Sequence, residues 1–96
     1  MNVMITHPVQ ISLHSMNDED QRRVTAWFDY LKNWETDDFL RTNSRKLPME
    51  GNVCLLDTLS DLLIIFSVEG EEISMLEVGR PEMLEMFREA KARQSS

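Results

Sequence analysis

Two apolar runs separated by a short acidic turn constrain the fold of this chain more than any other feature. The runs are "LLIIFSV" at 62–68 and "ISMLEV" at 73–78, with "EGEE" between them. Aliphatic and β-branched runs around a glycine-containing turn are typical of a β-hairpin. Because the first run has almost no polar position, it predicts a strand that is buried on both faces.

Further elements flank this hairpin. The stretch "NVCLL" at 52–56 predicts another short strand, so that three consecutive strands form an antiparallel meander. The stretch "RPEMLEMFREAKARQ" predicts a terminal helix that starts near Pro81, because proline is favoured at the first helical position. The predicted inward face of this helix holds Met83, Leu84, Phe87 and Ala90.

The N-terminal half carries weaker periodic signals. Residues 7–15, "HPVQISLHS", alternate apolar and polar side chains, which predicts a strand with one solvated face. Residues 18–34 have apolar side chains at helical spacing behind several candidate capping residues, and they predict a helix. A short helix is expected at 36–42, with Phe39 and Leu40 turned inward.

Together these elements predict an α+β protein with the order β-α-α-β-β-β-α and with helices packed on a small antiparallel sheet. A length of 96 residues suits one domain, 1–96, and no repeat, linker or low-complexity segment divides the chain.

The charge distribution limits the possible partners. The chain has 17 acidic and 10 basic residues and a formal net charge of −7, which opposes a sequence-independent grip on phosphate backbones. One internal segment, "FLRTNSRKLP" at 39–48, carries bases and no acid. Its Arg41, Arg45 and Lys46 are candidates for binding nucleic acid, another anion or an acidic partner. The alternative is an ordinary solvated loop.

Cysteine and histidine usage gives no sign of a cofactor site. Cys54 is the single cysteine, and its apolar neighbours suggest a buried thiol. His7 and His14 are more consistent with surface histidines than with an acid–base pair. No residue pair has convincing metal-ligand spacing, so we expect no metal and no small-molecule cofactor.

The sequence also predicts where the protein works. Its first residues lack the basic and apolar regions of a secretory signal, and no run reaches the roughly 18 apolar residues that span a bilayer. We therefore expect an unprocessed cytoplasmic protein with no membrane partner.

The order of elements and several short motifs resemble the RelE/ParE superfamily of toxins from bacterial type II toxin-antitoxin systems. The resemblance covers about residues 9–90 and implies the RelE/ParE-like fold. The motifs are Lys46-Leu47 before a short strand, Ile65-Phe66 in the buried strand, Glu69-Gly70 in the turn, and Val78-Gly79-Arg80 before the terminal helix.

The resemblance implies a set of site residues. RelE-type members cut messenger RNA in the ribosome, where basic residues stabilise charge on the attacked phosphate and an aromatic hydroxyl or a basic group transfers protons. The remaining candidates for catalysis are Arg80, Arg45 and Lys46. Other reactive positions of the family are apolar here: Cys54, Leu56, Leu62, Leu63 and Phe87.

Two of these residue assignments have alternatives. Arg80 would contact phosphate, or it would be a solvated arginine paired with Glu77 or Glu82. Phe87 has no hydroxyl and is expected in the core. A family antitoxin would lie across the meander and the terminal helix, which makes Leu84 and Phe87 the candidate partner-binding residues.

Three functions are compatible with the sequence. The first is a toxin-family protein of a toxin-antitoxin system that acts by binding, with messenger RNA endonuclease activity weak or lost. The second is an active toxin, either a ribosome-dependent messenger RNA interferase or an inhibitor of DNA gyrase. The third is an acidic adaptor that binds a basic protein surface and is unrelated to toxicity. The first two imply a cognate antitoxin as partner.

Overall fold

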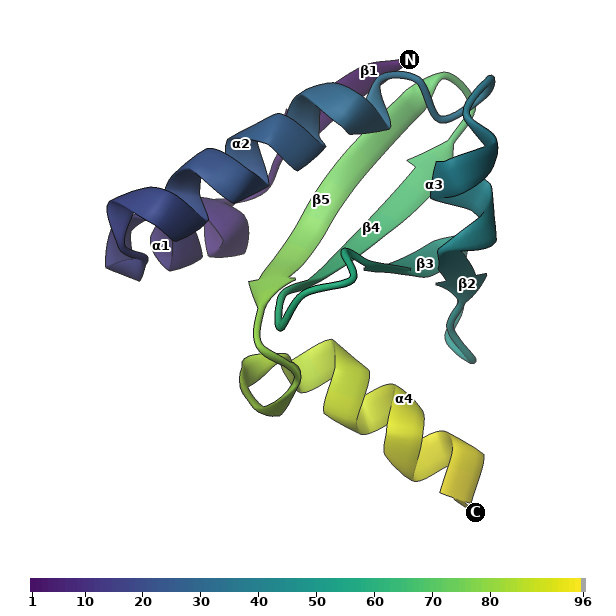
Figure 1. Cartoon of the computed structure of the whole chain (residues 1–96). Helices are drawn as coiled ribbons and strands as arrows, with labels where there is room; N and C mark the ends of the chain where they lie inside the picture. The colour runs from purple at the N-terminus through teal and green to yellow at the C-terminus, as the bar shows by residue number, and fades with distance from the viewer. Residues whose placement is uncertain (96) are drawn as a thin grey trace.

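A mixed five-stranded sheet forms the centre of the computed structural model, which describes residues 1–95 (Figure 1). The sheet has helices on both faces. In chain order the elements are β1 (Asn2–Ile5), α1 (His7–Ser15), α2 (Asp18–Leu31), α3 (Asp38–Thr42), β2 (Ser44–Lys46), β3 (Val53–Asp57), β4 (Leu63–Glu69), β5 (Glu72–Gly79), the one-turn helix η1 (Pro81–Met83) and α4 (Glu85–Ser95).

The predicted meander is confirmed. The strand order is β1-β5-β4-β3-β2, and β4 pairs antiparallel with both β3 and β5. Gly70 turns the hairpin with a φ of +58°, a conformation that glycine adopts without steric cost. The bulge in β5 lies opposite Ile65 and Phe66. Strand β1 joins the sheet parallel to β5, so the sheet is mixed rather than purely antiparallel.

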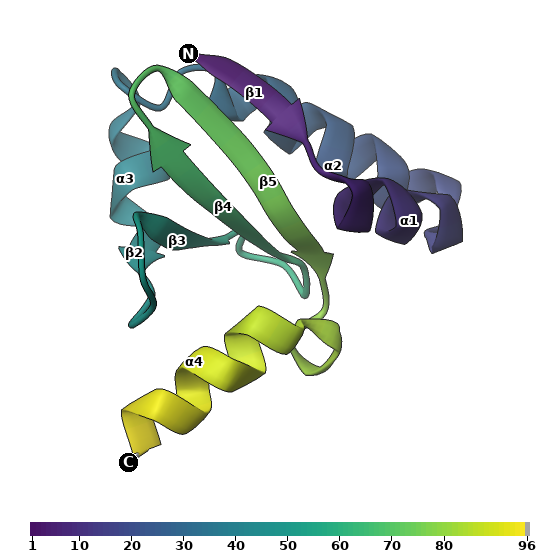
Figure 2. The same ribbon diagram turned by 180° about the vertical axis from the view of Figure 1, so that it is seen from behind.

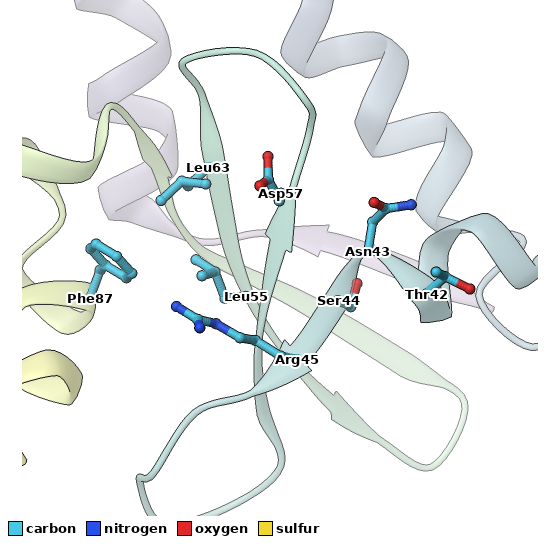
Figure 3. Close-up of a pocket in the computed structure, with 8 residues that line it drawn as sticks. All are labelled: Thr42, Asn43, Ser44, Arg45, Leu55, Asp57, Leu63 and Phe87. Carbon is cyan, nitrogen blue, oxygen red and sulfur yellow. The ribbon is translucent and has the colours of Figure 1, made fainter. Parts of the chain in front are cut away.

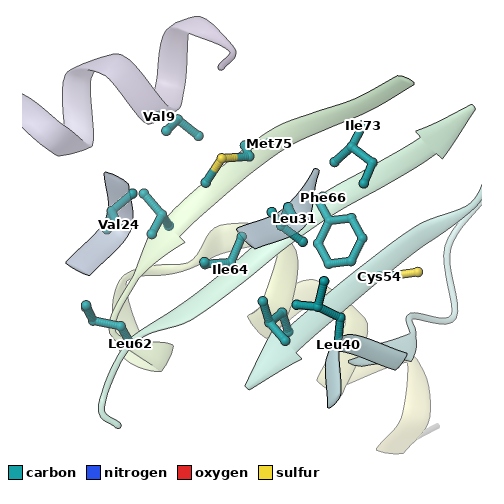
Figure 4. Close-up of a cluster of buried hydrophobic side chains, with 12 residues drawn as sticks. Val9, Val24, Leu31, Leu40, Cys54, Leu62, Ile64, Phe66, Ile73 and Met75 are labelled. Carbon is teal, nitrogen blue, oxygen red and sulfur yellow. The ribbon is translucent and has the colours of Figure 1, made fainter. Parts of the chain in front are cut away.

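The larger core lies between the sheet and the N-terminal helices (Figure 4). Phe66 is fully buried there, and the ring of Trp34 packs edge-on against it at a centroid distance of 5.3 Å. Helices α1, α2 and α3 contribute Val9, Val24, Leu31 and Leu40 to this core. Leu62–Phe66 are buried, which confirms the prediction of a strand covered on both faces.

The second face of the sheet is covered in part by α4, which Figure 2 shows from behind. Leu84, Phe87 and Ala90 pack there against β3 and β4 through Leu55, Leu63 and Ile65. The predicted inward position of Met83 is wrong, because Met83 belongs to η1 and is 74% exposed. The terminal helix therefore begins four residues later than Pro81.

The predicted strand at 7–15 is wrong, since these residues form α1. Pro8 lies in the first turn of this helix, where its missing N–H costs no hydrogen bond. The apparent alternation is not a buried stripe: Val9 is fully buried, whereas Ile11 is 56% exposed. The first strand is instead β1, which the sequence reading overlooked.

Two further boundaries differ from the predictions. Helix α2 ends at Leu31, and hydrogen-bonded turns continue to Thr36. The expected short helix exists as α3, but Phe39 is 37% exposed, so only Leu40 is turned inward as predicted. The basic segment is not a loop, because its end forms the edge strand β2, antiparallel to β3.

Candidate functional site

A pocket of about 470 Å³ lies where the β2–β3 edge of the sheet faces α4 (Figure 3). We call it the edge pocket. Four elements build it: β2 with the two residues just before it, the strands β3 and β4, and α4 with one side chain. Its lining residues are Thr42, Asn43, Ser44, Arg45, Leu55, Asp57, Leu63 and Phe87.

Strand pairing explains which side chains reach this pocket. Arg45 is opposite Leu55 in the β2–β3 register, and Asp57 is opposite Leu63 in the β3–β4 register. Paired residues share a face of the sheet, and Leu55 and Leu63 belong to the core under α4. The guanidinium of Arg45 and the carboxylate of Asp57 are therefore carried on the face that α4 partly covers.

Arg45 supplies the positive charge of the edge pocket. Within the described residues its guanidinium makes no hydrogen bond and no ion pair. In Figure 3 it extends toward Phe87. A guanidinium presents five donors in a planar fork, so this side chain is available to an anion.

The remaining polar atoms of the pocket are less free. Asp57 Oδ1 accepts a hydrogen bond from the N–H of Leu59 at 2.8 Å, which holds a tight turn where Leu59 has a φ of +61°. Ser44 differs, because its Oγ is buried and has no hydrogen-bond partner in the described chain. A buried hydroxyl without a partner is energetically costly.

Phe87 and Leu84 lie inside the protein. They are 8% and 3% exposed, and both belong to the core between α4 and the sheet. Phe87 therefore packs in the core, as expected for a side chain without a hydroxyl. Because so little of either side chain is exposed, a partner can contact them extensively only if α4 separates from the sheet.

The three candidate catalytic cations do not gather at one place. Lys46 is next to Arg45 in β2 and opposite Cys54, which belongs to the core on the other face. Lys46 lines a different, shallow depression with Arg93. Arg80 lies beyond the end of β5, and its Nε is 3.1 Å from Asp61 Oδ2. That ion pair replaces the expected alternatives, Glu77 and Glu82.

Arg41 has a structural role. Its side chain donates hydrogen bonds to the backbone carbonyls of Trp34 and Glu35 in the turns that follow α2. Because Arg41 belongs to α3, these bonds tie the turns after α2 to the following helix. Of the basic cluster Arg41, Arg45 and Lys46, the structure directs only Arg45 into the edge pocket.

The other titratable candidates are in the expected environments. Cys54 is buried, and desolvation raises the pKa of its thiol, which opposes nucleophilic reactivity. His7 and His14 are exposed, as predicted, although both lie on α1.

Among residues 1–95 no group of three histidine, cysteine or carboxylate side chains could hold a metal ion. No helix in that range is long and apolar enough to cross a membrane.

Solved structures of toxins are among those that match this arrangement of elements. The isolated RelE toxin of Escherichia coli matches with a TM-score of 0.63 and 12% identity, over 97% of each chain. The chain has the RelE/ParE-like fold. A copper-bound mutant toxin from Helicobacter pylori has a TM-score of 0.57 and 15% identity, over 88% of this chain and 98% of the toxin.

A further match is a conserved hypothetical protein from Helicobacter pylori. It has a TM-score of 0.53 and 13% identity, over 85% of this chain and 96% of the other. No protein-family model and no curated protein matches the sequence. The structural similarity thus supports the resemblance inferred from the motifs. The sequence identity is so low that individual site residues of these proteins need not be present here.

Several pocket residues were not predicted from the sequence. Thr42 and Asn43 directly precede β2 and Ser44 is its first residue, and the sequence did not predict this strand. Asp57 directly follows the predicted strand 52–56, and its alternation with Leu55 could have identified it.

Proposed function

We propose that this chain is a RelE/ParE-like toxin-family protein of a toxin-antitoxin system that acts by binding, with messenger RNA endonuclease activity weak or lost. The composition of the edge pocket carries this proposal. Its eight lining residues include one cation, Arg45, and one carboxylate, Asp57, but no histidine, lysine or tyrosine.

This composition is poorly suited to RNA cleavage. Attack of a 2′-hydroxyl on the neighbouring phosphate needs a group that removes the proton, donors that stabilise the added negative charge, and an acid for the leaving oxygen. A single guanidinium provides donors but does not transfer protons at neutral pH, because its pKa is far higher. The Asp57 carboxylate would repel the phosphate.

The positions of the other basic residues are also poorly suited to RNA cleavage. Arg80 is paired with Asp61 and lines a different cavity from Arg45. Catalysis by several cations requires them to converge on one phosphate, because misplacement by about 1 Å can cost a hundredfold in rate. A binding function has no such requirement.

The proposed partner is a cognate antitoxin that uses the sheet and α4. Leu84 and Phe87 are the side chains it would contact if α4 moved away from the sheet. Ribosome-bound messenger RNA or DNA gyrase is the target to test for any residual toxic activity. The whole chain, 1–96, is proposed to act as one cytoplasmic domain.

One observation favours an active toxin as the second candidate. The Arg45 guanidinium has no partner in the described chain, and the buried Ser44 Oγ in the same pocket has none either. Both groups could bind a phosphate or a ribose hydroxyl. If this pocket retains activity, Arg45 is the residue on which that activity depends.

Tightly controlled expression tests the proposal. Growth and total protein synthesis should continue after induction of the wild-type chain, with Arg45→Gln as a matched variant that removes the charged guanidinium and keeps a polar side chain. Arrest by the wild type that Arg45→Gln abolishes would support the active toxin instead. Circular dichroism of both purified proteins verifies that each is folded.

A further inference from the structure

A second cavity, of about 390 Å³, lies at the end of β5, where the corner between α1 and α2 meets η1. We call it the β5-end pocket. Its walls combine apolar side chains, including Met16, Leu62 and Met83, with two carboxylates, Asp20 and Glu77. The edge pocket, by contrast, has one carboxylate and one guanidinium without a partner in the described chain.

Asp20 is the most buried charged residue that lines this pocket. The residue is 9% exposed, and its backbone N–H donates to Asn17 Oδ1 at 2.8 Å. Its carboxylate accepts no hydrogen bond within residues 1–95, and its one ion pair there, with Arg23 Nη1, spans 3.8 Å. The Asp20 side chain is 13% exposed, so its carboxylate is reachable from the pocket, and it has no close cationic partner in the described chain. A ligand cation would form a shorter, charge-assisted pair with it.

The other charged groups leave the pocket negative. Glu77 Oε2 accepts a hydrogen bond from the N–H of Met86 at 3.1 Å, and burial raises the pKa of this carboxyl group. A neighbouring cation would stabilise its ionised form. Arg80 also lines the pocket, but its charge is paired with Asp61, which does not.

We propose that the β5-end pocket receives an arginine or lysine side chain of a partner polypeptide. The aliphatic part of such a side chain packs against Met16 and Leu62, while its charged end reaches Asp20. Met83, 74% exposed beside the pocket, gives the residue flanking that arginine or lysine an apolar contact, and methionine adapts to such surfaces.

The occupant follows from charge and shape. A chain with a net charge of −7 attracts a basic segment over a distance of about one Debye length. A free amino acid would leave Met83 uncovered, whereas a polypeptide covers it. This inference goes beyond the proposed toxin-family function and does not depend on it.

Titration of the ¹⁵N-labelled full chain with an acetylated, amidated tripeptide of leucine, arginine and leucine tests the proposal. Saturable amide shifts are expected at Asp20, Gly79 and Met83. The same tripeptide with glutamine in place of arginine should bind about tenfold more weakly, because it lacks the charge-assisted hydrogen bond. Arginine methyl ester alone should also bind more weakly than the arginine tripeptide.

Two variants locate the binding site. Asp20→Asn should weaken tripeptide binding about tenfold, whereas Asp18→Asn, an exposed residue of the same helical turn, should leave it unchanged. Glu77→Gln should also weaken binding, and its amide oxygen can still accept from Met86. If Asp20→Asn does not fold, Glu77→Gln decides.

The proposal is overturned by any of four results. These are no shifts at the pocket, equal binding of the glutamine tripeptide, wild-type affinity in the folded pocket variants, and arginine methyl ester binding as tightly as the tripeptide. The last result would assign the pocket to a small cationic molecule.

Discussion

Glu77 Oε2 accepts a hydrogen bond from the backbone N–H of Met86 at 3.1 Å and thereby joins β5 to the first turn of α4. Burial raises the pKa of Glu77, against the opposing influence of that hydrogen bond. The folded chain therefore binds this proton more tightly than the unfolded chain does. Its stabilising contribution is complete below the unfolded pKa and is lost as the pH rises through the folded pKa.

Glu77→Gln removes this titration and keeps an acceptor for Met86. The free energy of unfolding of the variant, relative to wild type, should thus be higher at neutral pH than at pH values below the unfolded pKa of glutamate. Urea unfolding across the acidic to neutral range measures it. Glu72→Gln controls for loss of one negative charge on the same strand. A difference between Glu77→Gln and wild type that is independent of pH would contradict the assignment.

The Asn17 side chain caps α2, because its Oδ1 accepts from the N–H of Asp20. Asn17→Ala should lower the free energy of unfolding by about 1 kcal/mol, the usual cost of losing an N-cap. Asn2→Ala, which truncates an exposed asparagine with no side-chain hydrogen bond in the described chain, is the control. Equal stability of both variants would argue against the cap.

Phe66 fills the larger core and packs against Trp34. Phe66→Ala should cost about 3–5 kcal/mol, since truncation of a buried aromatic ring loses transfer free energy and leaves a cavity. Met83→Ala, at a 74% exposed side chain, should change stability by less than about 0.5 kcal/mol. Thermal or urea unfolding of the three proteins gives the comparison, and a small effect at Phe66 would show that the core packing is described incorrectly.

Two hydroxyl groups are expected to differ in the sign of their effect. Ser44 Oγ is buried without a partner, so Ser44→Ala should stabilise the fold by about 1 kcal/mol. Thr58 Oγ1 donates to the carbonyl of Leu62 at 2.7 Å, and Thr58→Val should destabilise it by a similar amount. Equilibrium unfolding decides both, and destabilisation by Ser44→Ala would mean that this hydroxyl has a partner after all.

The sequence predicted the part of the fold that rests on long periodic runs. The β4–β5 hairpin and the burial of Leu62–Phe66 follow from two apolar runs around one glycine, a pattern with few alternatives. The predicted strand at 7–15 was wrong because a stretch of nine residues can alternate apolar and polar side chains by chance. In the structure this stretch is a helix, and it packs Val9 into the larger core.

The candidate site was harder to predict than the fold. Arg45 was recognised as a candidate from its charge. The face of the sheet on which its side chain lies depends on the β2–β3 register. That register could not be predicted, because β2 has three residues and no recognisable sequence pattern. The separation of Arg45 from Arg80 likewise follows from sheet order. Neither the number of residues between Arg45 and Arg80 nor their charge reveals how far apart they lie in the fold.

Primer extension on messages in purified translating ribosomes tests the central claim most directly. With the wild-type chain added, we expect full-length message and no new 5′ ends, because the edge pocket offers one guanidinium and no proton-transfer pair beside it. Arg45→Gln should give the same pattern. New 5′ ends within the ribosome-covered codon that depend on the wild-type chain and vanish with Arg45→Gln would contradict the account.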